Sequence, residues 1–75
     1  MLKKILEIIS IQLDVPTENL NEECILTELG VDSLTLMKII MGIENTFDIH
    51  IDDDEIVDLR TITDIANLTV RKVSF

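Results

Sequence analysis

The sequence predicts an all-α fold, a small four-helix bundle with a long first loop and a short third helix. Apolar residues recur at three- and four-residue spacing in three separate segments, which is the pattern of amphipathic helices. Two glycines and one proline leave few positions that would break a helix. Alternation with a period of two is limited to the short run 47–51, so no sheet is expected. The chain of 75 residues fits one domain, and residues 1–75 are therefore predicted to form a single unit.

The first helix is predicted at residues 2–13. One face of this segment gathers its apolar residues, which are Leu2, Ile5, Leu6, Ile9 and Leu13. Pro16 ends the helix, because proline lacks the N–H that the helix needs and restricts the residue before it. Residues 17–32 then form a long connection. Its apolar side chains, expected to pin it to the core, are Leu20, Ile25, Leu26 and Leu29. A structured loop of this length in so small a domain is usually functional.

The second helix, residues 33–47, has the clearest pattern. Asp32 or Ser33 supplies the oxygen that caps its first turn. At about 100° per residue, one side of the helix forms a core stripe. The stripe consists of Leu36, Ile39, Ile40, Ile43 and Phe47. A second apolar flank, outside the stripe, consists of Leu34, Met37 and Met41. The polar arc consists of Thr35, Lys38, Gly42, Asn45 and Thr46. The apolar surface is therefore wider than the core needs, and methionine suits adaptable contacts.

Two further helices, the first of them short, complete the predicted bundle. Acids in the first turn favour a short helix at residues 52–59, because the helix dipole stabilises negative charge there. Thr61, with Asp64 three residues later, is predicted to cap the last helix. The side chains of that helix expected to face inward are Ile62, Ile65, Leu68 and Val73.

The charge of the chain excludes several classes of partner. The net charge is −9, and between Ile5 and Leu59 fourteen acids accompany one base, Lys38. Such a surface repels nucleic acid and anionic membranes and steers the protein toward basic patches on other proteins. The lone Cys24 forms no internal disulfide and fits a reducing compartment. No stretch has the length of a membrane span or the pattern of a signal peptide, so a cytoplasmic protein without membrane partners is expected.

The start of the second helix holds the candidate site, Ser33. A hydrolase would need a base and an oxyanion hole around it, but His50 is the only histidine and no Gly-x-Ser-x-Gly motif is present, so no catalytic residue is predicted. The acids at 52–55 lack the glycine turn and the spacing of a calcium loop, so no metal site is predicted. A phosphate ester on Ser33 would meet free backbone N–H groups at the helix start. The residues alone also allow Asp32 and Ser33 to be a plain N-cap pair.

The segment Leu29-Gly30-Val31-Asp32-Ser33-Leu34 resembles the attachment site of the acyl carrier and peptidyl carrier protein family. The helix ending Ile43-Glu44-Asn45-Thr46-Phe47-Asp48-Ile49 and the last helix opening Thr61-Ile62-Thr63-Asp64-Ile65-Ala66 extend the resemblance over essentially the whole chain. It implies a single carrier domain without enzymatic activity. It also implies that a phosphopantetheinyl transferase attaches 4′-phosphopantetheine from coenzyme A to Ser33. The thiol of that arm would hold acyl, aminoacyl or polyketide intermediates as thioesters.

The same resemblance makes the helix after Ser33 the recognition surface for the transferase and for acyl- or aminoacyl-loading and condensing enzymes. The residues assigned to recognition are Asp32, Leu34, Met37, Met41 and Glu44. Carriers of the fatty-acid type hold a dense run of acids on this helix, whereas Lys38 and its polar neighbours dilute the run here. This difference favours a specialised biosynthetic pathway. A monomer is expected. The alternative is an acidic helical adaptor that binds a basic protein partner and has no covalent cofactor.

Overall fold

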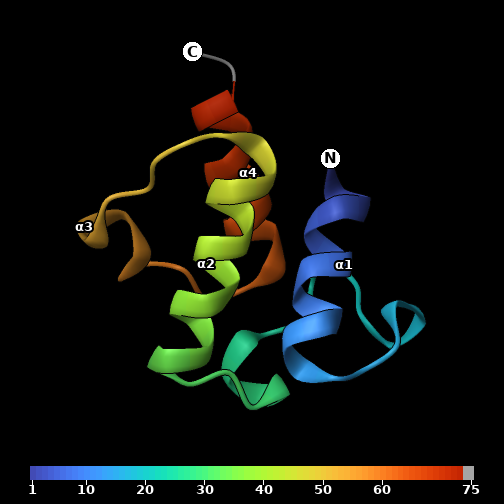
Figure 1. Cartoon of the computed structure of the whole chain (residues 1–75). Helices are drawn as coiled ribbons and strands as arrows, with labels where there is room; N and C mark the ends of the chain where they lie inside the picture. Colours follow the sequence, from blue (N-terminus) through green and yellow to red (C-terminus); the bar gives the residue numbers. More distant parts are fainter. Residues whose placement is uncertain (74–75) are drawn as a thin grey trace.

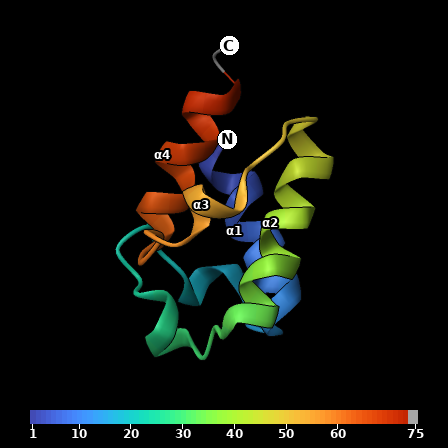
Figure 2. The ribbon, with the colours of Figure 1, turned by 90° about the vertical axis from the view of Figure 1, so that its left-hand side faces the viewer.

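Three helices form the body of the molecule, and a fourth, very short helix lies on the side opposite the first one. The computed structural model describes residues 1–73, and Figures 1 and 2 show the arrangement, with α3 lying between α2 and α4 and away from α1. The α-helices are α1 (Leu2–Leu13), α2 (Ser33–Phe47), α3 (Asp53–Ile56) and α4 (Ile62–Val73). Two 3-10 helices, η1 (Thr17–Asn19) and η2 (Leu26–Leu29), lie in the long first loop. The predicted all-α class is confirmed.

Isoleucines dominate the core, because the inward faces of α1, α2 and α4 all present them. The buried apolar residues are Ile5, Ile9, Leu20, Leu26, Val31, Ile39, Ile40, Ile43, Ile51, Ile56, Ile62, Ile65 and Leu68. The predicted core stripe of α2 lies on this side, with Leu36 and Phe47 partly buried at its edges. Thr69 is the buried polar residue of the described chain, and its hydroxyl donates to the carbonyl oxygen of Ile65 at 2.8 Å. The hydroxyl is therefore satisfied inside the helix.

The long first loop is joined by backbone hydrogen bonds to the start of α4. Ile25 and Thr61 form an isolated antiparallel bridge. The Leu26 N–H donates to the carbonyl oxygen of Arg60 at 2.8 Å, and the Thr63 N–H donates to that of Glu22 at 2.8 Å. The prediction that Ile25 pins the loop to the core is wrong, because its side chain is 41% exposed. In this extended stretch neighbouring side chains point to opposite sides, and Leu26 takes the inward position.

Gly42 faces α1 and not the polar arc in which the sequence pattern placed it. A Cβ atom added to Gly42 would lie 2.9 Å from the Cγ2 atom of Ile8. The Ile8 side chain of α1 therefore occupies the space that a side chain at position 42 would need. This contact was not visible in the sequence, because the pattern of α2 alone gives no information about which residue of α1 lies opposite.

The last two helices depart from the predictions in two further places. α3 is shorter than the predicted 52–59, because the Leu59 N–H turns back to the carbonyl oxygen of Ile56 at 3.1 Å and closes the helix after one turn. Val73 does not face inward and is 44% exposed. At about 100° per residue, Val73 lies roughly 140° around the helix from the buried Leu68.

The predicted cap of α4 is present. The Asp64 N–H donates to the Thr61 hydroxyl oxygen, and the Thr61 N–H donates to the Asp64 carboxylate, each at 3.1 Å. The carboxylate also accepts the Arg60 N–H at 2.9 Å. These backbone donors, that of Arg60 first, hold the pKa of Asp64 below its usual value. The pair satisfies donors that the first turn of a helix leaves unpaired.

Candidate functional site

A left-handed turn at Gly30 positions the start of α2. Gly30 has φ of +85°, a conformation that side chains with a Cβ rarely adopt. Its N–H donates to the carbonyl oxygen of Thr27 at 3.1 Å. The N–H of the next residue, the buried Val31, donates to the carbonyl oxygen of Leu26 at 3.1 Å. The chain is thus fixed by backbone contacts up to the residue before Asp32. This is the physical role of the glycine in the Leu29–Leu34 segment.

Asp32 is the cap of α2. Its carboxylate oxygen Oδ1 accepts the Thr35 N–H at 2.8 Å, so Asp32 and not Ser33 supplies the capping oxygen. This hydrogen bond is the main reason that the pKa of Asp32 is lowered, and the charge of Lys38 lowers it further. Because the capping position is occupied by the neighbouring residue, the Ser33 side chain is not needed for the helix.

Ser33 is the first residue of α2 and is exposed. Within residues 1–73, the backbone N–H groups of Ser33 and Leu34 have no acceptor in the protein. A phosphate ester on the Ser33 oxygen would lie next to these donors and at the positive end of the helix dipole, so the residues present fit such a group. The one histidine does not serve Ser33, since the ring of His50 contacts Glu44 and Asp52.

The predicted apolar flank of α2 is on the surface. The exposed fractions are 66% for Leu34, 40% for Met37 and 56% for Met41. These three residues, called the docking flank below, follow Ser33 along the helix at three- and four-residue spacing and form one continuous strip. A strip of this kind can make small, exchangeable apolar contacts.

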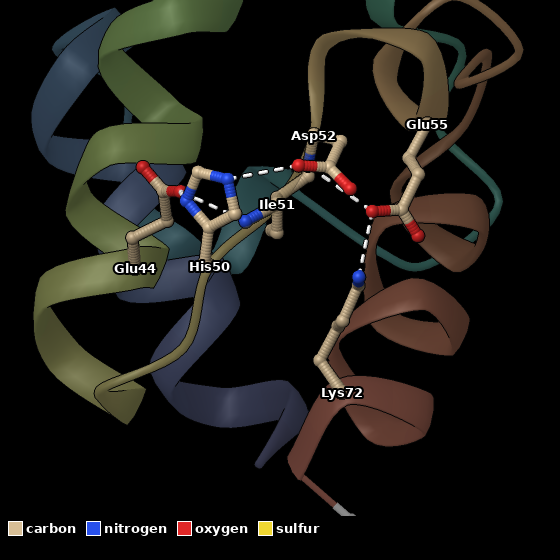
Figure 3. A network of polar contacts seen from close by, with 6 residues as sticks. All are labelled: Glu44, His50, Ile51, Asp52, Glu55 and Lys72. Atoms are coloured by element: carbon tan, nitrogen blue, oxygen red, sulfur yellow. Dashed lines mark hydrogen bonds and ion pairs between the residues drawn. The ribbon is translucent and has the colours of Figure 1, made fainter.

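Glu44, which the sequence assigned to partner recognition, lies in a polar network at the other end of α2 (Figure 3). Its side chain is only 25% exposed, and Oε2 accepts the N–H of the buried Ile51 at 2.8 Å. The same oxygen lies 3.4 Å from Nδ1 of His50, whose Nε2 lies 2.9 Å from Oδ1 of Asp52. The recognition role of Glu44 remains a prediction, but its carboxylate already has partners inside the protein.

The network continues across α3 to α4. The Asp52 N–H donates to Oε1 of Glu55 at 3.1 Å, and the same oxygen is 2.6 Å from the ammonium nitrogen of Lys72. The Lys72 ammonium holds the pKa of Glu55 below its usual value, and Glu55 raises that of Lys72. We call the five residues Glu44, His50, Asp52, Glu55 and Lys72 the far-end network. The sequence reasoning missed it; only the spacing of Asp52 and Glu55, which suits a capping pair, indicated a part of it.

Two negative findings limit the chemistry of the described residues. Between residues 1 and 73, no group of three or more His, Cys, Asp or Glu side chains is arranged to hold a metal ion. No helix in this part of the chain is long and apolar enough to cross a membrane.

Comparison with known proteins identifies the family. Residues 3–69 match the family model described as the phosphopantetheine attachment site. The chain belongs to the acyl carrier protein family. It is 37% identical over 75 residues to the acyl carrier protein of Syntrophus aciditrophicus, covering 97% of this chain and 94% of that protein. It is 38% identical over 63 residues to the acyl carrier protein of Syntrophobacter fumaroxidans, covering 83% of this chain and 78% of that protein.

Two solved structures have the same fold over nearly the whole chain. The crystal structure of the acyl carrier protein from Thermotoga maritima matches with a TM-score of 0.84 and 30% identity, covering 96% of this chain and 85% of that one. A chain in the solved structure of the ishigamide ketosynthase/chain length factor matches with a TM-score of 0.80 and 26% identity, covering 99% and 94% of the two chains.

Membership of the family decides between the alternatives left by the sequence. An acyl carrier protein holds acyl intermediates on covalently attached 4′-phosphopantetheine and is a carrier, not an enzyme. The predicted cofactor and the absence of enzymatic activity are therefore confirmed. The alternative of an adaptor without a covalent cofactor is not supported.

Proposed function

We propose that Ser33 is the residue that carries the 4′-phosphopantetheine arm. The observation that supports this most is the exposed hydroxyl on the first residue of α2, next to two backbone N–H groups that have no acceptor within residues 1–73. When bound, the arm supplies a thiol that forms thioesters with the cargo. Ser33 contributes the oxygen of the phosphodiester, and the helix start stabilises the phosphate charge. Asp32 fixes the first turn, so that the hydroxyl stays on the surface.

We also propose that the exposed side of α2 is the surface to which partner enzymes bind. Leu34, Met37 and Met41 supply apolar contacts close to Ser33. Asp32, at the start of the same helix, lies next to the proposed attachment residue and would contact a phosphopantetheinyl transferase. Loading and condensing enzymes would use the same strip in turn, since a small interface allows rapid exchange of partners. Nucleic acid and membrane surfaces are not expected as partners of a monomeric carrier with a net charge of −9.

The cargo is proposed to belong to a specialised biosynthetic pathway and not to general fatty acid synthesis. Two observations support this proposal. The recognition helix carries one acid and one base between Ser33 and Phe47, unlike the acid-rich helix of the fatty-acid type. The chain is also similar to one found in the structure of the ishigamide ketosynthase/chain length factor, so a condensing enzyme of that class is a suitable partner to test.

Intact-mass measurement tests the attachment site. The purified chain is incubated with coenzyme A and a broad-specificity phosphopantetheinyl transferase. We expect the wild-type chain to gain the mass of one phosphopantetheine and the Ser33→Ala variant to gain none. Thr46→Ala, which removes an exposed hydroxyl at the other end of α2, is the matched control and should load like the wild type. A gain that persists in Ser33→Ala would show that another residue is modified.

A further inference from the structure

The side of α2 that follows Ser33 carries a positive charge, although the protein as a whole is strongly acidic. Between Ser33 and Phe47 the charged residues are Lys38 and Glu44. Lys38 is exposed, and among residues 1–73 it makes no ion pair with an N···O distance of 4.0 Å or less. Its ammonium group therefore remains available to a docked protein.

Glu44 does not balance this charge on the surface. Its side chain is turned toward the loop after α2, where Oε2 accepts the Ile51 N–H at 2.8 Å and lies 3.4 Å from Nδ1 of His50 (Figure 3). Rotating Glu44 outward to meet a partner would leave the buried N–H of Ile51 without an acceptor, which is costly. The far-end network therefore withdraws the one acid of α2 from the surface that partners contact.

Lys38 lies directly beside the docking flank. It follows Leu34 by four residues and precedes Met41 by three, so the three side chains are neighbours on the helix surface. The net charge of −9 acts on an approaching protein over longer distances, but salt screens it beyond about 10 Å at 0.1 M ionic strength. Within α2, Lys38 is the exposed charged side chain beside the apolar strip, and the neighbouring charge of opposite sign is that of Asp32 at the helix cap.

We infer that Lys38 sets the charge preference of the docking flank. The partner that fits this surface presents an apolar socket for Leu34, Met37 and Met41 with a carboxylate beside it, opposite Lys38. A partner with lysine or arginine at that place is disfavoured, because juxtaposed like charges lower affinity and slow association. This inference rests on the proposed role of α2 as the partner surface, and it names the chemistry of the partner.

Loading kinetics with two different transferases test the inference. One phosphopantetheinyl transferase is chosen with a carrier-binding surface rich in lysine and arginine, the other with one rich in aspartate and glutamate. The rate constant kcat/KM for transfer from coenzyme A is measured at low and at high salt for the wild type, Lys38→Gln and Lys38→Glu. Lys4→Glu is the matched control, since it makes the same change in net charge at an exposed position on α1.

We expect Lys38→Glu to raise kcat/KM about fivefold with the basic transferase and to lower it by a similar factor with the acidic one at low salt. Lys38→Gln should give intermediate values, Lys4→Glu should change either rate less than about twofold, and high salt should reduce all differences. Equal effects of Lys38→Glu and Lys4→Glu, or a change of the same sign with both transferases, would overturn the inference. Failure of the wild-type chain to load with either transferase would instead contradict the proposed function.

Discussion

The two ends of α2 are both capped by an aspartate, but only the C-terminal end is joined by a side-chain network to α3 and α4 within the described residues. At the N-terminal end, the Asp32 carboxylate caps the helix, and backbone hydrogen bonds around the left-handed turn at Gly30 and the 3-10 helix before it fix the chain that leads into α2. At the C-terminal end, Asp48 adopts a left-handed conformation and its N–H donates to the Glu44 carbonyl oxygen. There, in addition, the Glu44 side chain and the rest of the far-end network connect α2 to α3 and α4.

This difference fits what each end must do. The proposed attachment at Ser33 needs a side chain that is free of partners, and among residues 1–73 the Asp32 cap and the backbone contacts leave the exposed Ser33 side chain free while still fixing its position. The other end has no such requirement, and α3, a helix of four residues with one buried side chain, needs polar contacts to hold it. The following predictions test this division, from the largest expected effect to the smallest.

Replacing Glu44 by Ala should destabilise the fold while leaving the attachment reaction intact. The change leaves the N–H of buried Ile51 unpaired, and an unsatisfied buried donor costs about 1–3 kcal/mol. Denaturant unfolding measures the loss, and intact mass after incubation with transferase and coenzyme A measures the attachment. Glu44→Gln, which keeps an acceptor oxygen, should lose less. Loss of attachment at unchanged stability in Glu44→Ala would show that Glu44 binds the partner instead.

Replacing Gly30 by Ala should lower stability by about 1–2 kcal/mol, the usual cost of placing a Cβ in a left-handed conformation. Open space surrounds the position, so the cost arises from the backbone and not from a clash. Gly30→Asn is the control, because asparagine tolerates this conformation better and should restore part of the loss. Equal unfolding free energies for the wild type and Gly30→Ala would contradict the backbone explanation of this end.

Replacing Asp32 by Asn should remove an acid-sensitive part of the stability. The Thr35 N–H lowers the pKa of Asp32 in the folded chain, so the carboxylate stabilises the fold above its usual pKa, near 4, and loses this contribution as the pH falls below that value. Asparagine caps a helix equally well but does not titrate. The wild type should therefore lose stability relative to Asp32→Asn between about pH 5 and pH 3.

Thermal unfolding at several pH values gives the comparison for Asp32. Asp54→Asn is the control, because the Asp54 carboxylate accepts no hydrogen bond from another residue of the described chain. A stability difference between the wild type and Asp32→Asn that does not change over this pH range would show that the cap does not depend on the charge.

Replacing His50 by Ala should have the smallest effect, below about 0.5 kcal/mol. The His50 side chain is 79% exposed, and exposed ion pairs contribute little. Glu44 keeps its contact with the Ile51 N–H in this variant. A loss as large as that of Glu44→Ala in denaturant unfolding would show that the ring, and not the backbone contact, holds the loop.

The sequence predicted the elements that depend on local patterns. The bounds of α1 and α2, a cap at Asp32 or Ser33, the exposed methionines and the pair Thr61–Asp64 all follow from helix periodicity and capping rules, and the structure has Asp32 in the capping position. Each of these depends on residues within a few positions of one another, so a single sequence contains the necessary information.

The features that the sequence did not predict depend on contacts between distant segments. Gly42 faces Ile8 of α1, and Ile25 points outward because its backbone pairs with Thr61. The sequence placed Glu44 on the surface, since its position on α2 borders the docking flank. In the structure its carboxylate accepts a hydrogen bond from the N–H of Ile51, seven residues later. For the site, the sequence therefore predicted Ser33 and the apolar strip in the places where the structure has them, but not the charge that surrounds the strip.

The pairing of residues 22–26 with residues 60–63 also bears on when the protein matures in the cell. The Thr63 hydroxyl donates to the Glu22 carbonyl oxygen at 2.6 Å, across 41 positions of the chain. The loop that leads to Ser33 is therefore completed only by residues that are synthesised after it. A nascent chain that still lacks residues 60–63 presents the serine on an unfinished loop. We expect modification to follow the end of synthesis, so that a carrier is loaded only after it has folded.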